Sequence, residues 1–406
     1  MIREILVDTW SLITGVAACI TLPGSVELFG LSAAALLPVR RSAATTPDAP
    51  WRVAIVVPAH NEALSIRACI ASLHQSSLHQ AGQSNMQTTV YVIADNCTDN
   101  TAELASLARA TVLERNNPTE RGKGYALHYA FTRLEELGFD CVLIVDADTS
   151  VAPDFVVTAA GALRDGAAAV QVRYLARNAE DSIRTRLMAL ALRAFNVVRL
   201  RGRQNLGLSA GLLGNGFGLR RETLQAVPYL ASSVVEDLEY HINLVRSGRR
   251  VTFVGETTVF GETPVRGKGV EIQRSRWEGG RLRMLYDKGP GLFRDVLQGR
   301  LRCLEPLLEL LLLPLAFHVV LLVIAVTSPL PIVREIALAG IAVVLFHLGV
   351  TIIIGKGGWR DLVTLASAPF YILWKLLLIP SLLRNANSKH AWVRTTRNEE
   401  GDGDGN

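Results

Sequence analysis

Long apolar runs near both ends of the chain limit what this sequence can fold into. Residues 12–37 are almost entirely apolar, and the runs 307–327 and 332–354 are separated only by a short turn. About 20 consecutive apolar residues match the hydrocarbon core of a bilayer. Glu27 interrupts the first run, where a carboxylate is costly unless it faces protein or the interface. We therefore predict a membrane anchor over residues 1–42, a globular domain over 51–300, membrane and interfacial helices over 301–385, and a polar tail over 386–406.

Basic residues indicate on which side of the membrane the globular domain lies. Lys356, Arg360 and several basic residues after position 383 flank a third apolar stretch, residues 362–383. Because Lys and Arg concentrate on the cytosolic side, we expect that stretch to be re-entrant or interfacial, with a full span as the alternative. The N-terminal run is longer than the apolar part of a signal peptide, which favours a retained, kinked anchor. These features predict a multi-pass protein of the cell membrane (inner or plasma membrane) with a cytosolic globular domain.

Charge and cysteine content exclude other classes of protein. The net charge is only +5, and the basic residues are scattered rather than gathered in a stripe with interleaved aromatics, so a nucleic-acid partner is not expected. The five cysteines form no CxxC pair and no metal-like spacing with histidine. We expect them to be reduced, as in a domain that faces the cytosol.

The block 51–300 alternates short apolar runs with helical patterns, which is typical of an α/β domain with a mostly parallel sheet. We predict buried strands and helices in this block. The strands are residues 53–57, 90–94, 141–145 and 168–172, and the helices are residues 63–72 and 101–108.

Polar and acidic residues follow three of the predicted strands. Pro58, His60 and Glu62 follow the first, Asp95 the second, and Asp146 with Asp148 the third. One acidic residue in such a loop is usually only a helix cap, but in a parallel sheet all three strand ends meet at the edge where ligands bind. The Asp-X-Asp pair puts two carboxylates on one side of an extended segment, where they can hold a hard cation such as Mg²⁺ or Mn²⁺ against a diphosphate.

Two later motifs complete the pattern. Glu236 and Asp237 follow two valines, and Gln273, Arg276 and Trp277 form Gln-X-X-Arg-Trp. Alone, the acidic pair would be read as charges that complement a helix dipole, and the tryptophan as an interface anchor.

The order of these motifs resembles glycosyltransferase family 2, in the membrane-embedded branch with cellulose, chitin and hyaluronan synthases and bacterial exopolysaccharide transferases. The resemblance covers the whole block and its membrane arrangement. It implies a GT-A type nucleotide-sugar-binding domain with a mostly parallel sheet, flanked by transmembrane helices. It also implies a nucleotide-sugar donor, and a lipid-linked or growing polysaccharide acceptor.

The resemblance assigns a role to each motif. Donor binding falls to Pro58, His60, Glu62, Asp95, Lys123, Asp146 and Arg276; metal binding to Asp146 and Asp148; catalysis to Asp237 as general base with Glu236; and acceptor binding to Gly214, Asn215, Gly216, Gln273 and Trp277. A carboxylate that removes the acceptor proton and a guanidinium that neutralises the leaving diphosphate also fit the chemistry of such a transfer. The expected reaction is a single inverting displacement, and UDP is the family's commonest donor nucleotide.

Alternatives remain open at this stage. The few predicted spans favour limited addition to a lipid-linked acceptor, or a channel built from several copies or with other polysaccharide-assembly subunits. The Gln-X-X-Arg-Trp motif is instead typical of processive synthases that also extrude their product. An inactive scaffold would have lost a carboxylate, and a transporter would place ionisable residues inside its spans. Neither pattern is seen here.

Overall fold

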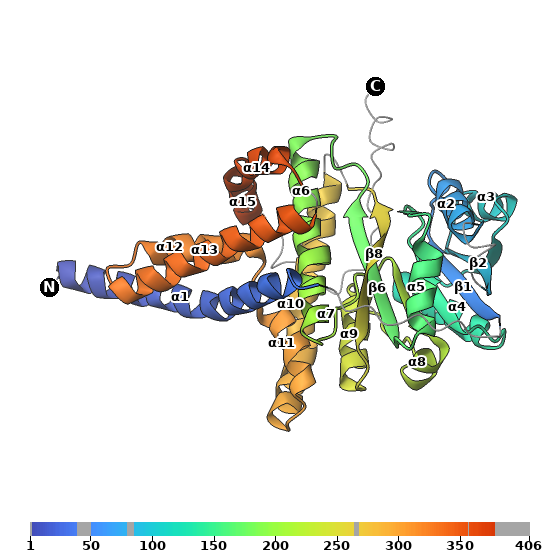
Figure 1. Ribbon diagram of the computed structural model, residues 1–406, viewed down its shortest axis with the longest axis horizontal. Helices are drawn as coiled ribbons and strands as arrows, with labels where there is room; N and C mark the ends of the chain where they lie inside the picture. Colours follow the sequence, from blue (N-terminus) through green and yellow to red (C-terminus); the bar gives the residue numbers. More distant parts are fainter. Residues whose placement is uncertain (1, 39–49, 79–84, 264–267, 356, 378–406) are drawn as a thin grey trace.

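The computed structural model describes residues 2–38, 50–78, 85–263, 268–355 and 357–377. Within α10, the side chains of residues 268–277 lie outside that description. A globular block carries a long helical bundle on one side (Figure 1).

An eight-stranded sheet forms the centre of the globular block, in the order β3-β2-β1-β4-β7-β6-β8-β5. β1 pairs in parallel with β2 and β4, β2 with β3, and β6 with β8, whereas β7 runs antiparallel to β4 and β6. The four predicted strands coincide with β1, β2, β4 and β6, except that one residue extends beyond β4 and one precedes β6, so the mostly parallel α/β fold is confirmed. The strands are β1 (Trp51–Ala59), β2 (Met86–Asp95), β3 (Thr111–Arg115), β4 (Cys141–Ile144), β5 (Ser150–Val151), β6 (Ala169–Ala176), β7 (Phe217–Arg220) and β8 (Val251–Gly261).

Alternate residues of the central strands enter two separate cores, one on each face of the sheet. Val53, Ile55 and Val57 of β1 belong to one core, and Ala54 and Val56 to the other. All five are fully buried, which is why the run lacks the polar alternation of a one-sided strand. The helices around the sheet are α2 (Ile66–Leu78), α3 (Thr101–Leu107), α4 (Lys123–Glu135), α5 (Phe155–Arg164), α8 (Arg221–Ala226) and α9 (Glu236–Arg246).

A second set of helices lies between the sheet and the bundle. In α6 and its continuation the hydrogen bonding changes from α to π and back to α without a loop. The π-helical turn matters because it places Arg199 at the junction with the bundle. This set comprises α6 (Ile183–Arg193), the π-helix η1 (Ala194–Arg199), α7 (Leu200–Asn205), α10 (Lys268–Leu297), the 3₁₀ turn η2 (Leu301–Cys303) and α11 (Leu304–Leu311).

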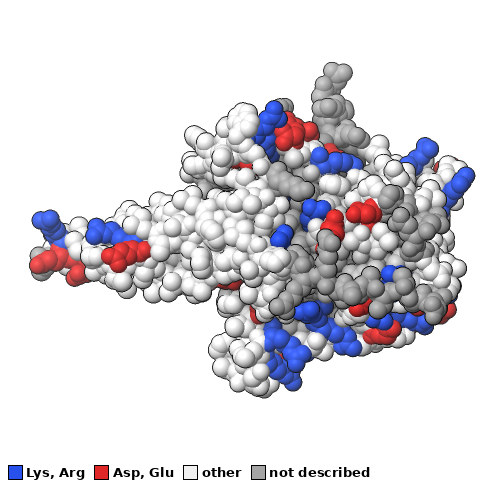
Figure 2. Space-filling view, viewed as in Figure 1, with Lys and Arg blue, Asp and Glu red and all other residues white. Residues whose placement is uncertain are grey.

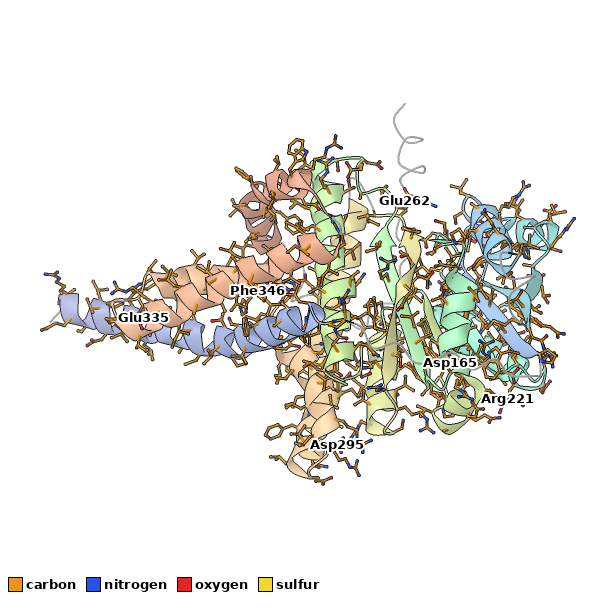
Figure 3. All side chains as sticks on the ribbon, in the orientation of Figure 1. Asp165, Arg221, Glu262, Asp295, Glu335 and Phe346 are labelled. Carbon is orange, nitrogen blue, oxygen red and sulfur yellow. The ribbon has the colours of Figure 1, made fainter. Side chains whose placement is uncertain are left out.

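Helices α1 (Ile2–Ala35), α12 (Leu315–Val326) and α13 (Pro331–Ile354) form the bundle. Its interior is mostly apolar, with buried polar pairs such as Ser32 and His347, and Phe346, labelled on α13 in Figure 3, lies with its ring 5.7 Å from that of Phe29. On the face shown in Figure 2, charged side chains lie near the tip of the bundle and at its junction with the globular block. By length and composition, α1 and α13 can each cross a membrane. α1 is one continuous helix through Pro23 and begins ten residues before the apolar run that starts at Leu12.

Residues 307–327 do not form the single helix that the sequence predicted. α11 and α12 meet at a 76° bend across the break Leu312–Pro314. Leu312 is extended, and Pro314 precedes α12 as a residue that cannot donate a backbone hydrogen bond. The 12 residues of α12 are about 18 Å long, less than the hydrocarbon thickness of roughly 30 Å.

The described part of the stretch 362–383 is also broken, into α14 (Trp359–Leu365) and α15 (Ala368–Leu377). α14 contacts α6, and α15 contacts α12. Arg193 of α6 forms two bonds, of 2.9 and 2.8 Å, to the carboxylate of Asp361. The part of each helix that the structure describes, 7 residues of α14 and 10 of α15, is shorter than a membrane span.

Candidate active site

A cavity of about 1380 Å³ lies between the carboxyl edge of the sheet and the membrane-type helices. We refer to it as the central cavity. Its lining includes the polar residues predicted after β1, β2 and β4, together with Lys123, Gly214, Glu236 and Asp237. Glu262, labelled in Figure 3 just after β8, also lines it. The sequence positions from 58 to 237 are therefore brought together because the parallel strands end at one edge.

Lys123 lies beside the first carboxylate of the Asp-X-Asp pair. Its Nζ contacts the carboxylate of Asp146 and donates to the carbonyl oxygen of Gly214 at 2.6 Å. Burial alone would lower the pKa of Lys123, but Asp146 and then Glu236 raise it, and the net shift is upward. The ammonium group therefore keeps its positive charge against the carboxylates of the cavity.

The side-chain amide of Asn215 holds the loop that carries Asp146 and Asp148. Asn215 Oδ1 accepts from the backbone N–H of Asp146 at 3.1 Å, and its Nδ2 donates to Thr149 Oγ1 at 2.8 Å. Gln171, fully buried on β6, donates to the carbonyl oxygen of Asn215 at 2.8 Å. These contacts hold the backbone of the loop that carries both carboxylates.

This arrangement differs from the sequence prediction for the glycine-rich loop, which gave Gly214, Asn215 and Gly216 to the acceptor. Only Gly214 lines the cavity. The Asn215 side chain is buried under the Asp146–Asp148 loop, and a β-carbon on Gly216 would lie 2.6 Å from Val259. Asn215 and Gly216 thus lie beneath the cavity wall because β7 enters the sheet there.

Asp95, at the end of β2, is held by an arginine that the sequence reading missed. Arg115 Nη1 donates to Asp95 Oδ1 at 2.7 Å, and the same guanidinium reaches the carbonyl and carboxylate of Glu120 at 2.8 and 2.9 Å. His60 Nδ1 lies 2.8 Å from the carbonyl oxygen of Asp95. The first and second predicted loops are therefore joined, and Pro58 and Glu62 line the cavity beside them.

Glu236 and Asp237 begin α9 and face the same cavity. Burial, and then repulsion from Asp237, raises the pKa of Glu236 to about 7, against an opposing effect of Lys123. Burial also raises the pKa of Asp237, although a hydrogen bond from the backbone N–H of Leu238 to its Oδ1, at 2.8 Å, opposes the shift. Carboxylates with raised pKa values in a cavity are candidates for proton transfer.

The backbone of Gln273, Arg276 and Trp277 lies within α10, but their side chains lie outside the described residues. Their assignment to the donor and the acceptor therefore stays a prediction.

A charged cluster at the junction with the bundle was also missed, apart from Glu27. Arg199 lies 3.4 Å from Glu27 and 3.3 Å from Glu309, and Arg203 lies 3.0 Å from Glu305 and contacts Glu309. A signal existed in the sequence: each of these residues stands in or beside an apolar segment, where an ionisable group requires a partner.

Comparison with known proteins identifies the fold and the family. A solved structure of a mannosyltransferase from Pyrobaculum calidifontis, in complex with GDP-Man and Mn²⁺, has a TM-score of 0.55 at 17% identity and covers 94% of this chain and 100% of its own. At that identity the likeness shows the fold alone, which is the expected GT-A type.

A curated relative, an N-acetylglucosaminyltransferase of Rhizobium leguminosarum bv. viciae, is 33% identical over 140 residues. The match covers 34% of this chain and spans about a third (31%) of the relative's length. The model of the family described as glycosyltransferase like family 2 matches residues 49–280, more than half of the chain. The chain therefore belongs to glycosyltransferase family 2.

Proposed function

We propose that this glycosyltransferase is a membrane-bound, metal-dependent, inverting enzyme that transfers a hexosyl unit from a nucleotide diphosphate to a lipid-linked or growing polysaccharide acceptor. The observation that carries the proposal is the shared cavity. Asp146, Asp148 and Lys123 lie on its wall with Glu236 and Asp237, so charges suited to a diphosphate and carboxylates suited to an acceptor hydroxyl face the same space.

The carboxylates of Asp146 and Asp148 suit Mg²⁺ or Mn²⁺. Among the described residues, no group of three or more His, Cys, Asp or Glu side chains is arranged to hold a metal ion. Two carboxylates fit a cation of this kind, since Mg²⁺ is usually bound through one or two carboxylates, with waters and substrate phosphates completing its shell. The bound ion would neutralise charge that develops on the diphosphate. The buried amide of Asn215 would keep both carboxylates in place for it.

Asp237 is the proposed general base. It would accept the proton of an acceptor hydroxyl while the oxygen attacks the anomeric carbon from the side opposite to the diphosphate. Glu236, with its pKa raised to about 7, would be protonated part of the time near neutral pH. Protonated Glu236 does not repel the negative charge of Asp237, so Asp237 can stay ionised. One such displacement converts an α-linked donor into a β-linked product.

Asp95 is proposed to bind the nucleoside, with Arg115 and His60 holding it. Asp95 is only 6% exposed and lines the cavity, so a bound base would contact its carboxylate out of bulk water. A carboxylate can accept from the N–H of a pyrimidine or a guanine base. UDP-sugars are therefore the first donors to test, and GDP-Man, present in the Pyrobaculum complex, is the natural second.

Membrane binding is proposed from α1 and α13, which are long and apolar enough to span. Large apolar side chains such as Leu12 and Leu345 are 69% and 63% exposed on them, as expected for lipid-facing positions. The predicted cytosolic orientation of the globular domain follows from the basic residues around positions 356–397.

The test is release of nucleoside diphosphate by the full chain in nanodiscs, with a panel of UDP- and GDP-sugars, in Mn²⁺, in Mg²⁺ and in chelator. We expect release with one donor, its loss in chelator, and a fall of at least about 100-fold in Asp148→Asn and in Asp237→Asn. Asp148→Asn should lose the metal response, whereas Asp237→Asn should keep donor binding and lose turnover.

Asp165→Asn is the matched control, because this carboxylate follows α5, is labelled in Figure 3 and does not line the cavity. It should behave as wild type. Normal turnover in Asp237→Asn would contradict the assignment of Asp237 as the general base. Release of nucleoside diphosphate that persists in chelator would contradict the proposed metal dependence. Sizing of the products on gels would separate one addition from a processive chain.

A further inference from the structure

The central cavity continues past the carboxylates into the space between the membrane-type helices. Leu28 of α1, Val319 of α12, Leu348 of α13 and Ile372 of α15 line the same cavity as Asp148. We refer to this part as the inner chamber. With about 1380 Å³ in total, the cavity exceeds the roughly 300–1,000 Å³ that holds a small-molecule ligand. A nucleotide-sugar alone would leave the inner chamber unfilled.

The polar groups of the inner chamber already have partners within the protein. His318 Nε2 lies 3.2 Å from Ser25 Oγ, and His347 Nδ1 lies 2.8 Å from Ser32 Oγ. The remaining lining residues of α12 and α13 are apolar. The hydroxyl groups of a polysaccharide would lose their hydrogen bonds to water on this surface and gain few in return, which is costly. A hydrocarbon chain has no such hydrogen bonds to lose, and its burial is favourable.

Charged residues of α1, η1, α7, α10 and α11 line the same cavity, and most of them pair with one another. Three arginines face three glutamates, and Arg281 donates to the carbonyl oxygens of Glu309 and Leu312. These residues, which we refer to as the neck, are Arg199, Arg203, Arg281, Glu27 and Glu309, which line the cavity, and Glu305, which pairs with Arg203 behind them. An anionic head group would have to break buried ion pairs to bind a cation here, at a large cost. An uncharged head with hydroxyl groups could pass without that cost.

We propose that the inner chamber holds the hydrocarbon chains of a membrane lipid whose head is uncharged and carries hydroxyl groups, and that this lipid is the acceptor. The proposal rests on the function proposed above. The lipid hydroxyl oxygen would bond to the anomeric carbon as the bond from that carbon to the diphosphate oxygen breaks. Asp237 would receive the hydroxyl proton, and the nucleoside diphosphate would leave.

The test measures lipid binding by native mass spectrometry on the full chain released from detergent. The two probes are dioleoylglycerol and dioleoylphosphatidic acid, which carry the same chains and differ in the phosphate. We expect one dioleoylglycerol per chain and at least a tenfold weaker binding of the phosphatidic acid. Equal or tighter binding of the phosphatidic acid would overturn the uncharged head, and no binding of either probe would overturn the lipid chamber.

Leu348→Trp should fill the inner chamber and lower dioleoylglycerol binding at least tenfold. Its matched control is Leu345→Trp on the same helix, where the side chain is 63% exposed and does not line the cavity. A second pair, on α15, is Ala368→Trp, which lines the cavity, and Phe370→Trp, which is 77% exposed. Binding by both chamber variants at the wild-type level would overturn the proposal.

Release of nucleoside diphosphate in the same preparations separates the two proposals. Slow donor hydrolysis that persists in Leu348→Trp while lipid binding is lost would show a folded enzyme with a blocked chamber. Lipid binding without donor turnover in the wild type would reject the proposed function and leave the chamber as a lipid site. Donor turnover without lipid binding in the wild type would support the proposed function and reject the lipid chamber.

Discussion

Gly214 and Asp237 lie against each other in the wall of the central cavity. A β-carbon on Gly214 would be 3.1 Å from Asp237 Oδ2, and Gly214 has a φ of +76°. We therefore expect Gly214→Ala to displace the Asp237 carboxylate, which lowers kcat by about 100-fold, since small displacements of a reacting group have effects of that size. The unfolding free energy should fall by only about 1–2 kcal/mol because of the positive φ.

Gly207→Ala is the control for that variant. Gly207 has the same φ of +76°, but its β-carbon would meet only Arg250 Nη1, at 3.9 Å. It should lose similar stability and keep its turnover. Equal activity in the two variants would contradict the role given to Asp237.

The pH dependence of stability should report Glu236. Its pKa is raised from 4.5 to about 7 in the folded protein, mainly by burial and by Asp237. The folded state therefore holds this proton more tightly than the unfolded state, and the stabilisation is complete below pH 4.5 and lost as the pH rises through 7. Thermal unfolding in chelator should show a midpoint that falls over this range, and Glu236→Gln should reduce the fall. An identical pH dependence in the variant would contradict the shift.

Removal of Arg115 should weaken donor binding more than turnover. The Arg115–Asp95 pair is 2.7 Å long, with both side chains no more than 8% exposed. Arg115→Ala would release Asp95, so we expect the donor KM to rise about tenfold, equivalent to roughly 1.4 kcal/mol, with a smaller change in kcat. Arg115→Lys should recover part of the loss, because it keeps the charge but not the fork to Glu120. The exposed Arg133 of α4 supplies the control Arg133→Ala.

A fall in kcat without a change in the donor KM of Arg115→Ala would contradict the assignment of Asp95 to the nucleoside. Steady-state assays over a range of donor concentrations separate the two parameters. Donor binding measured in chelator would add a readout that turnover does not influence.

The neck should control stability through Arg203. Burial alone would lower the pKa of Arg203, but Glu309, Glu305 and Glu27 raise it above its usual value, so it stays charged. Arg203→Met leaves buried carboxylates unpaired, and the expected loss is about 3–5 kcal/mol. Thermal unfolding in nanodiscs should show it, and the further change Glu309→Leu should recover part of it. Arg201→Met on the same helix should have little effect, since Arg201 donates only to the carbonyl oxygen of Leu37 among its side-chain bonds in the described structure.

Much of the fold could be predicted from local patterns. The apolar runs of β1, β2, β4 and β6 are buried on both faces, and such runs can be recognised because nearly every side chain in them is apolar, with Gln171 of β6 as an exception. Asp95 and Asp146 could be proposed as site residues because a parallel sheet brings its strand ends to one edge. The order of motifs was enough to suggest the family.

Local patterns failed where the outcome depended on a distant partner. The bend at Pro314 separates α11 from α12 because α11 packs on α10, and no hydropathy pattern carries that information. Asn215 was predicted to bind the acceptor, yet the chain reversal before β7 turns its amide toward the Asp146 loop. Arg115 was overlooked since its partner Asp95 lies on the neighbouring strand.

Residue types and their order along the chain thus determined the enzyme family, the apolar segments and several of the charged residues that face the cavity, such as Asp95, Asp146 and Asp237. The folded chain alone decided which of them meet: Lys123 with Asp146, Arg203 with Glu309, and the inner chamber with the carboxylates. The physical reason is that periodicity and composition are properties of neighbours in sequence, whereas ion pairs and cavities form between segments that only packing brings together.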